Sequence, residues 1–144
     1  MIRPKEWLLL FIGLPNEKFD TDQIRVMKGM FLFGKEGPPS VRDLYGFSPH
    51  DYGPFAPPVY GDLDSLESQG LIRVEHITGT NRRVFELTSK GKQEFTRLVG
   101  HAPKDAFRAL ADTKKLVTSL GFAELLRHVY DKYPAYASRS VLNR

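Results

Sequence analysis

The chain has 144 residues and a formal net charge of +4, with 41% hydrophobic and 26% charged residues. These proportions are ordinary for one globular domain with its own hydrophobic core. The absence of cysteine excludes a disulfide framework and a thiolate metal site. The apolar run WLLLFIGL has only eight residues, too few to span a membrane, and it lacks the cleavage site of a signal peptide. We therefore expect a cytoplasmic protein.

The first third of the sequence predicts two helices. A proline near the start of the first apolar run suits the first turn of a helix, which we expect over residues 4–13. This helix is apolar almost all round, so it should be central. Asp20 followed by Gln23 resembles a capping box and predicts a second helix over residues 21–34.

The next segment, up to the hairpin, predicts a third helix. VRDLY fits one more helical turn, GFSPHDY fits a short edge strand, and a helix is expected over residues 54–69. Gly53 precedes a proline and should be extended, while Phe55 should be buried at the helix entry. Gly70 is expected to end the helix. The apolar residues of the helix share one face: Val59, Leu63 and Leu66.

The second half of the sequence predicts a hairpin followed by helices. LIRVEHI and RVFELT alternate between apolar and polar residues, and the Gly- and Asn-containing turn TGTNRR separates them. A helix should follow from Thr88 or Ser89, and Pro103 should open another. Gly121 separates that helix from FAELLRHVYDKY, and AYASRSVL should form a last short helix.

Charge is distributed unevenly between the two halves. Residues 1–70 carry 7 Lys and Arg against 10 Asp and Glu, a balance of −3, whereas residues 71–144 carry 14 against 7, a balance of +7. A basic half favours a polyanionic partner, although scatter of charge over a solvated surface would give the same count.

The order of helix, helix, short strand, helix, hairpin and helix is typical of a winged helix. The segment GLIRVEHITGTNRRVFELTSKGKQEF resembles the wing and following helix of PadR- and MarR-type regulators. The LT-x-x-G step common in those wings corresponds to Leu87, Thr88 and Gly91. This resemblance implies an α+β fold, a winged helix-turn-helix with a helical C-terminal extension.

The YGPF step at residues 52–55 is similar to a more particular group. Small, largely uncharacterised prokaryotic winged-helix proteins have YGPFS before their third helix and GLI after it, and the Panacea-type antitoxin domain has a related YGP step. Ala56 stands here where that pattern usually has serine. The resemblance covers roughly residues 4–100. It implies a fold and supplies no settled activity.

We therefore expect a winged-helix domain at residues 1–100 and a helical extension at residues 101–144. We predict a homodimer through residues 103–142, since the apolar stripes of the extension exceed what one small core needs. The alternative is that the extension completes the core of the monomer. These stripes contain Phe107, Leu110, Val117, Phe122, Leu125, Leu126 and Val129.

A DNA-reading winged helix needs polar or basic side chains on the exposed face of its third helix. That face should present Pro58, Gly61, Asp62 and Ser65, and it has no Lys or Arg. Its acidic residues would repel phosphates. The alternative is an acidic, solvated helix that docks a protein partner or nothing.

The wing gives the opposite indication, because basic residues surround it. Arginine and lysine contact phosphates and displace counterions, so these residues favour binding to double-stranded DNA. The alternative is a hairpin edge that charge protects from strand addition. The residues are Arg73, Arg82, Arg83, Lys90 and Lys92.

The sequence gives little support for an enzymatic function. The histidines His50, His76, His101 and His128 have no metal-ligand spacing, and no nucleophile elbow, P-loop or dinucleotide fingerprint is present. We expect no catalytic residue, metal or cofactor. The leading prediction is a small DNA-binding transcriptional regulator. The alternative is a protein-interaction adapter, an antitoxin-like or defence-associated module that does not read DNA.

Overall fold

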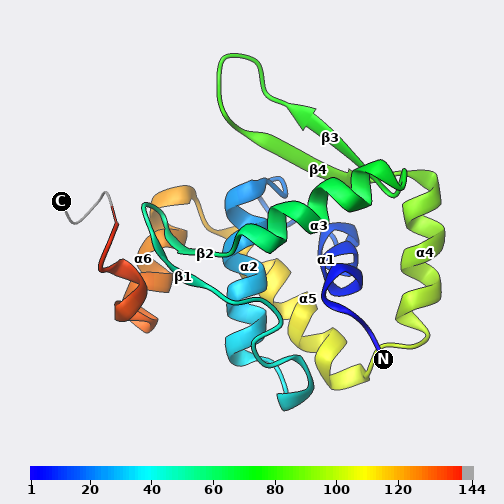
Figure 1. The fold of residues 1–144 in the computed structure, drawn as a ribbon, viewed down its shortest axis with the longest axis horizontal. Helices are drawn as coiled ribbons and strands as arrows, with labels where there is room; N and C mark the ends of the chain where they lie inside the picture. Colours follow the sequence, from blue (N-terminus) through cyan, green and yellow to red (C-terminus); the bar gives the residue numbers. More distant parts are fainter. Residues whose placement is uncertain (141–144) are drawn as a thin grey trace.

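The computed structural model describes residues 1–140, which form a mixed α+β domain (Figure 1). The helices are α1 (Pro4–Gly13), α2 (Gln23–Glu36), α3 (Pro57–Ser68), α4 (Ser89–Val99), α5 (Lys104–Ser119) and α6 (Phe122–Lys132). The strands are β1 (Ser48–His50), β2 (Gly53–Phe55), β3 (Ile72–His76) and β4 (Arg83–Leu87). Short 3-10 turns lie at η1 (Pro39–Val41) and η2 (Pro134–Ala137).

Helix α1 lies at the centre of the domain, as its apolar surface predicts. All residues from Trp7 to Ile12 are buried, and the helix packs against α2, α3, α4, α5 and β4 (Figure 1). At its start, Glu6 Oε1 accepts a hydrogen bond from the backbone N–H of Arg3 at 2.9 Å. The predicted helix over residues 4–13 is confirmed.

Helix α2 begins later than predicted. Its N-cap is Asp22, whose Oδ1 accepts a hydrogen bond from the backbone N–H of Arg25 at 2.9 Å. This bond satisfies one of the amides that the first helical turn leaves without a backbone partner. The capping box predicted from Asp20 and Gln23 is therefore wrong, because the extended residue before the helix is Asp22.

The third helix also begins later than predicted, at Pro57, because Pro54 belongs to a strand. Strands β1 and β2 pair antiparallel and place Pro49 opposite Pro54. A two-stranded sheet has only edges, where the missing N–H of proline costs little. The edge strand expected in GFSPHDY is confirmed, whereas the extra helical turn lies at Pro39–Val41, earlier than VRDLY suggested.

One expectation for the YGPF step holds in part, and the other is wrong. Gly53 lies in strand β2 opposite His50, as an extended residue should, but its φ is +93°, a value that glycine tolerates. Phe55 is half-buried, with its ring 4.8 Å from that of His50 and 5.5 Å from that of Tyr60. It packs within a row of aromatic rings near the surface instead of anchoring the helix in the core.

The predicted hairpin is confirmed as β3 and β4, with Ile72 paired with Leu87 and His76 with Arg83. Residues before α2 extend this sheet locally. Asp22 forms an antiparallel bridge with Val84, and the backbone N–H of Phe85 donates to the carbonyl of Thr21 at 2.9 Å. The hairpin is therefore joined to the start of α2 by backbone hydrogen bonding.

The helix ends on both sides of the hairpin also agree with the predictions from the sequence. Gly70 ends α3 with φ +74°, as expected of a residue just past a helix end. The Thr88 hydroxyl accepts a hydrogen bond from the backbone N–H of Gly91 at 3.0 Å and caps α4. The hairpin is thus held between two defined helix ends.

Helix α5 is integrated into the core, where it packs against α1 and α2. Its Lys114 is buried and donates from Nζ to the carbonyls of Phe11, Ile12 and Leu14 at 2.6, 3.2 and 2.8 Å. These carbonyls lie at the end of α1, where helical partners are missing. Burial lowers the pKa of Lys114 to about 7. One side chain of the extension thus caps the central helix.

Most apolar residues of the extension are covered within one copy of the chain. Leu110, Val117, Leu125, Leu126 and Val129 are buried, whereas Phe122 is 42% exposed. The exposed apolar surface on which the homodimer was predicted is therefore much smaller than the sequence suggests. The homodimer stays a prediction. The last short helix is a 3-10 turn at Pro134–Ala137. The end of AYASRSVL lies outside the described residues.

No helix within residues 1–140 is both long and apolar enough to cross a membrane.

Candidate nucleic-acid interface

Arg82 lies at the loop end of the hairpin and contacts the start of α2. Its Nε is 3.1 Å from Oδ2 of Asp22, and its Nη2 is 3.9 Å from Oδ2 of Asp20. The side chain remains 37% exposed. Arg82 is therefore both an ion-pair partner of the protein and accessible from solvent.

Arg83 connects the hairpin to α3. Its guanidinium carbon lies 5.2 Å from the centre of the Tyr60 ring and 5.6 Å from that of Phe85, within the range of cation–π attraction. Its backbone N–H donates to Oε1 of Gln23 at 2.8 Å. The loop end of the β3–β4 hairpin, the first turn of α2 and the first turn of α3 therefore meet at this arginine.

The other predicted wing cations lie elsewhere. Arg73 is paired across the hairpin with Glu86 at 3.5 Å and is exposed. Lys92 borders the same cavity of about 430 Å³ as Arg73, on the side of the hairpin that faces the end of α1. Lys90 donates from Nζ to the carbonyl of Gln69 at 2.9 Å. The predicted cations therefore do not form one continuous patch.

The predicted contact face of α3 is partly engaged within the protein. Pro58 and Gly61 are exposed. Asp62 accepts a hydrogen bond from the Tyr45 hydroxyl at 2.5 Å, and burial together with this bond raises the pKa of Tyr45. Ser65 accepts a hydrogen bond from Nζ of Lys5 at 3.1 Å. Only part of this face is free to contact a partner.

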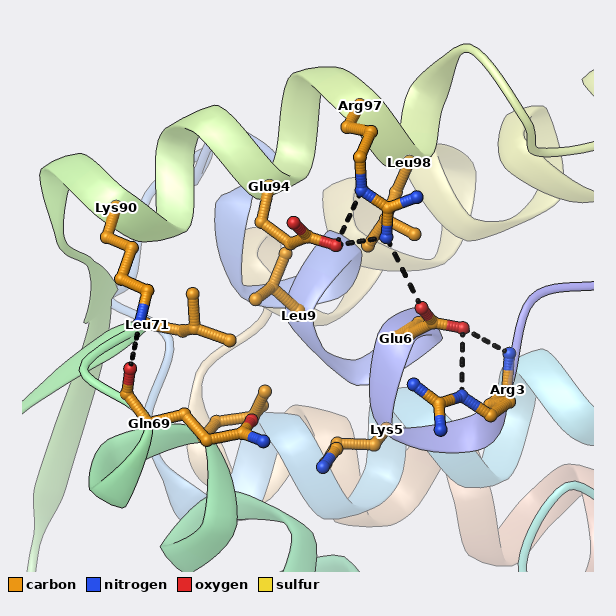
Figure 2. A pocket seen from close by; sticks show the side chains of 11 residues that line it. Arg3, Lys5, Glu6, Leu9, Gln69, Leu71, Lys90, Glu94, Arg97 and Leu98 are labelled. Carbon is orange, nitrogen blue, oxygen red and sulfur yellow. Dashed lines mark hydrogen bonds and ion pairs between the residues drawn. The ribbon is translucent and has the colours of Figure 1, made fainter.

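The surface of α3 is acidic, because Asp64 and Glu67 are exposed and the helix contains no Lys or Arg. Its neighbours supply positive charge instead. Figure 2 shows Lys5 from α1 and Lys90 from α4 on either side of Gln69, just beyond the end of α3. Sequence reasoning missed Lys5, since only the packing of α1 against α3 brings it there.

The pocket in Figure 2 has a volume of about 280 Å³ and an apolar floor that includes Leu9, Leu71 and Leu98. Part of its charged rim is paired within the protein. Arg97 contacts both Glu94 and Glu6, and its hydrogen bond lowers the pKa of Glu94. Within residues 1–140, Lys5 and Lys90 contact only neutral acceptors, and the four basic and two acidic side chains of the rim leave it with a balance of +2.

Sequence reasoning missed most of this rim. Arg3 with Glu6, and Glu94 with Arg97, are spaced at i and i+3, the separation of ion pairs on a helix. That spacing could have predicted each local pair. The contact of 3.7 Å between Arg97 and Glu6 joins α4 to α1 and depends on the fold.

Asp22 is the buried carboxylate beside the loop end of the hairpin, and sequence reasoning also missed it. It is 3% exposed, and its Oδ2 accepts a hydrogen bond from Nη1 of Arg25 at 2.7 Å. Arg25 is equally buried and donates to the carbonyls of Val117 and Leu120 at 3.0 and 2.7 Å. These hydrogen bonds compensate the cost of burying the ion pair.

Among residues 1–140, no three His, Asp or Glu side chains lie close enough together to hold a metal ion. The sequence matches no protein-family model, and no curated protein matches it. The function has to be inferred from the geometry of the chain itself.

Proposed function

We propose that this protein has a winged-helix fold and binds double-stranded DNA through the loop end of its wing, the β3–β4 hairpin. The order of elements supports the fold. Helix α1 is followed by an extended residue pair, Thr21 and Asp22, which bridges to β4, and then by α2, α3 and the β3–β4 hairpin. In this assignment α2 and α3 form the helix-turn-helix, and α3 is the helix that lies in the major groove. Helices α5 and α6 are the helical extension.

The observation that carries the proposal is the position of two arginines. Arg83 lies over the ring of Tyr60 in α3, and its neighbour Arg82 pairs with Asp22 at the start of α2. Wing, α2 and α3 are the elements with which a winged helix meets DNA, and two arginines lie where they converge. Arginines and helix N-termini supply many of the phosphate contacts in protein–DNA complexes. A small cytoplasmic transcriptional regulator is the role we assign to such a protein.

A second candidate function is supported by a different surface. Asp64 and Glu67 make the exposed side of α3 acidic, which opposes close approach to DNA. Tyr52 and Phe122 are 46% and 42% exposed, and their rings lie 5.8 Å apart. Exposed aromatic rings are common in protein interfaces. The alternative is therefore an antitoxin-like or defence-associated adapter that retains the fold without reading DNA.

Fluorescence anisotropy of a labelled duplex tests the proposal with two double variants. Arg82→Ala with Arg83→Ala removes the proposed contacts. Arg127→Ala with Arg139→Ala removes the same charge from exposed positions outside the wing. We expect the first pair to weaken binding about tenfold or more and the second to weaken it much less. Equal weakening by both pairs would move the interface away from the wing.

A further inference from the structure

A cavity of about 190 Å³ lies between the β1–β2 hairpin and α2. The YGPF step forms much of its wall, and the left-handed Gly53 lies within it. Rings from the hairpin and from α3 lie along one side, with the contacts at 4.8 and 5.5 Å already described. The aromatic residues of the wall are His50, Tyr52, Phe55 and Tyr60.

Lys28 of α2 also belongs to the wall of this cavity and is only 3% exposed. Among residues 1–140, its pKa reflects burial and the charge of Asp22, with no hydrogen bond. The other buried lysine, Lys114, has three carbonyl acceptors. The one buried side-chain nitrogen or oxygen without a hydrogen-bond partner in this range is Nε2 of His128, so Nζ of Lys28 is not sealed from solvent. The Lys28 ammonium is therefore available to a molecule in the cavity.

Within the described part of the chain, Lys28 is the one lysine or arginine in the cavity wall, and Asp51 is the one carboxylate. Asp22 already pairs with the buried Arg25 at 2.7 Å, and it acts on Lys28 only at longer range. Burial lowers the pKa of Lys28 to about 8, so most molecules carry this charge at neutral pH.

We propose that the cavity binds a small aromatic monocarboxylate, with Lys28 paired to its carboxylate. Lys28 offers one positive charge to a ligand, and Asp51 would repel a second negative charge, which favours a monoanion. The surrounding rings can pack against the planar, apolar body of such a molecule. The small volume limits that body to about one ring. This inference does not depend on DNA binding.

Isothermal titration calorimetry of the full chain with benzoate tests the proposal. We expect a Kd of about 1 mM, with benzamide and acetate each binding at least about tenfold more weakly, because one lacks the charge and the other lacks the ring. Lys28→Met should weaken benzoate binding by at least about tenfold. Lys115→Met is the matched control, since that side chain is 74% exposed and far from the cavity wall, and it should leave the Kd unchanged.

Lys28→Met removes no hydrogen bond, so the variant should fold, and a thermal melt followed by circular dichroism verifies this. Equal benzoate affinity of this folded variant and the unmodified protein would overturn the proposal. So would the absence of saturable benzoate binding up to about 10 mM. Inorganic phosphate or acetate binding as tightly as benzoate would overturn the assignment of an aromatic ligand. Tyr60→Leu should weaken benzoate binding and leave acetate binding unchanged.

Discussion

Arg82 places its Nε 3.1 Å from Oδ2 of Asp22, so the hairpin loop is tied to the residue that caps α2. The same carboxylate oxygen accepts a hydrogen bond from Arg25 at 2.7 Å. One buried carboxylate therefore joins the start of α2, the end of α5 and the wing, because Arg25 also reaches the carbonyl of Leu120. These contacts hold the loop end of the hairpin against the start of α2.

This ion pair predicts a measurable loss of stability when Arg82 is changed to Ala. The sequence alone suggests that hairpin charges contribute little, but Asp22 is buried and loses one of its donors. Because Arg82 is 37% exposed and Arg25 still pairs with the carboxylate, we expect a decrease of about 1 kcal/mol in the free energy of unfolding. Urea denaturation measures it, with Arg127→Ala as an exposed control. Identical values for the two variants would show that the pair adds no stability.

Much of the fold follows from local sequence signals. The apolar run of α1, the alternation of the hairpin and Gly70 identify elements whose structure depends mainly on neighbouring residues. The start of α3 was missed because Pro54 and Pro57 are equally suitable for a first turn, and only the pairing of Pro54 with Pro49 separates them. The N-cap of α2 was missed because two aspartates precede that helix.

The two buried lysines should respond in opposite ways to replacement by methionine. Lys114→Met leaves three carbonyls without their donor, so we expect a loss of about 2–4 kcal/mol in the free energy of unfolding. Lys28→Met replaces an ammonium whose lowered pKa shows that burial destabilises it, so we expect a gain of about 1–3 kcal/mol. Urea denaturation at neutral pH measures both.

The unmodified protein and Lys115→Met provide the references for these two variants. A loss of stability in Lys28→Met comparable to that in Lys114→Met would mean that Lys28 has a stabilising partner, contrary to the described contacts.

The lowered pKa of Lys28 predicts a dependence of stability on pH. The folded-state pKa is about 8, whereas an unfolded lysine titrates near 10.4. Between these values the unfolded chain binds more protons, so the free energy of unfolding rises with pH, by about 3 kcal/mol over the whole window. Below about pH 8 this contribution is constant.

The difference in stability between Lys28→Met and the unmodified protein isolates this effect from other titrating groups, Lys114 included. We expect the advantage of the variant to shrink as the pH rises from about 8 to 10, in urea denaturation series at matched ionic strength. A constant difference across that range would contradict the lowered pKa.

Gly53 should be less tolerant of alanine than Gly70. Both have positive φ, but a Cβ at Gly53 would lie 3.0 Å from Cε1 of Tyr130, whereas a Cβ at Gly70 would meet nothing within 4 Å. We expect Gly70→Ala to cost about 1 kcal/mol and Gly53→Ala about 2 kcal/mol or more. Thermal melts of both variants measure the two losses of stability. A larger loss in Gly70→Ala than in Gly53→Ala would show that Tyr130 moves aside freely.

The candidate site was less predictable than the fold. The sequence identifies the wing arginines by their place in the turn, yet it cannot show that Arg83 lies over Tyr60, which is 23 positions earlier. It also cannot show that Lys114 donates to three carbonyls while Lys28 lies in the wall of a cavity. These distinctions depend on which helix packs against which, and hence on the complete fold.

DNA binding by the wing is tested most directly by a salt titration of binding to a mixed-sequence duplex. Each phosphate contact contributes about 0.9 to the slope of log K against log salt. We expect salt-dependent binding by the unmodified protein, and a slope smaller by about two when Arg82 and Arg83 are both changed to Ala. The absence of salt-dependent binding to any such duplex near about 50 mM salt would contradict the account and favour the protein-interaction adapter.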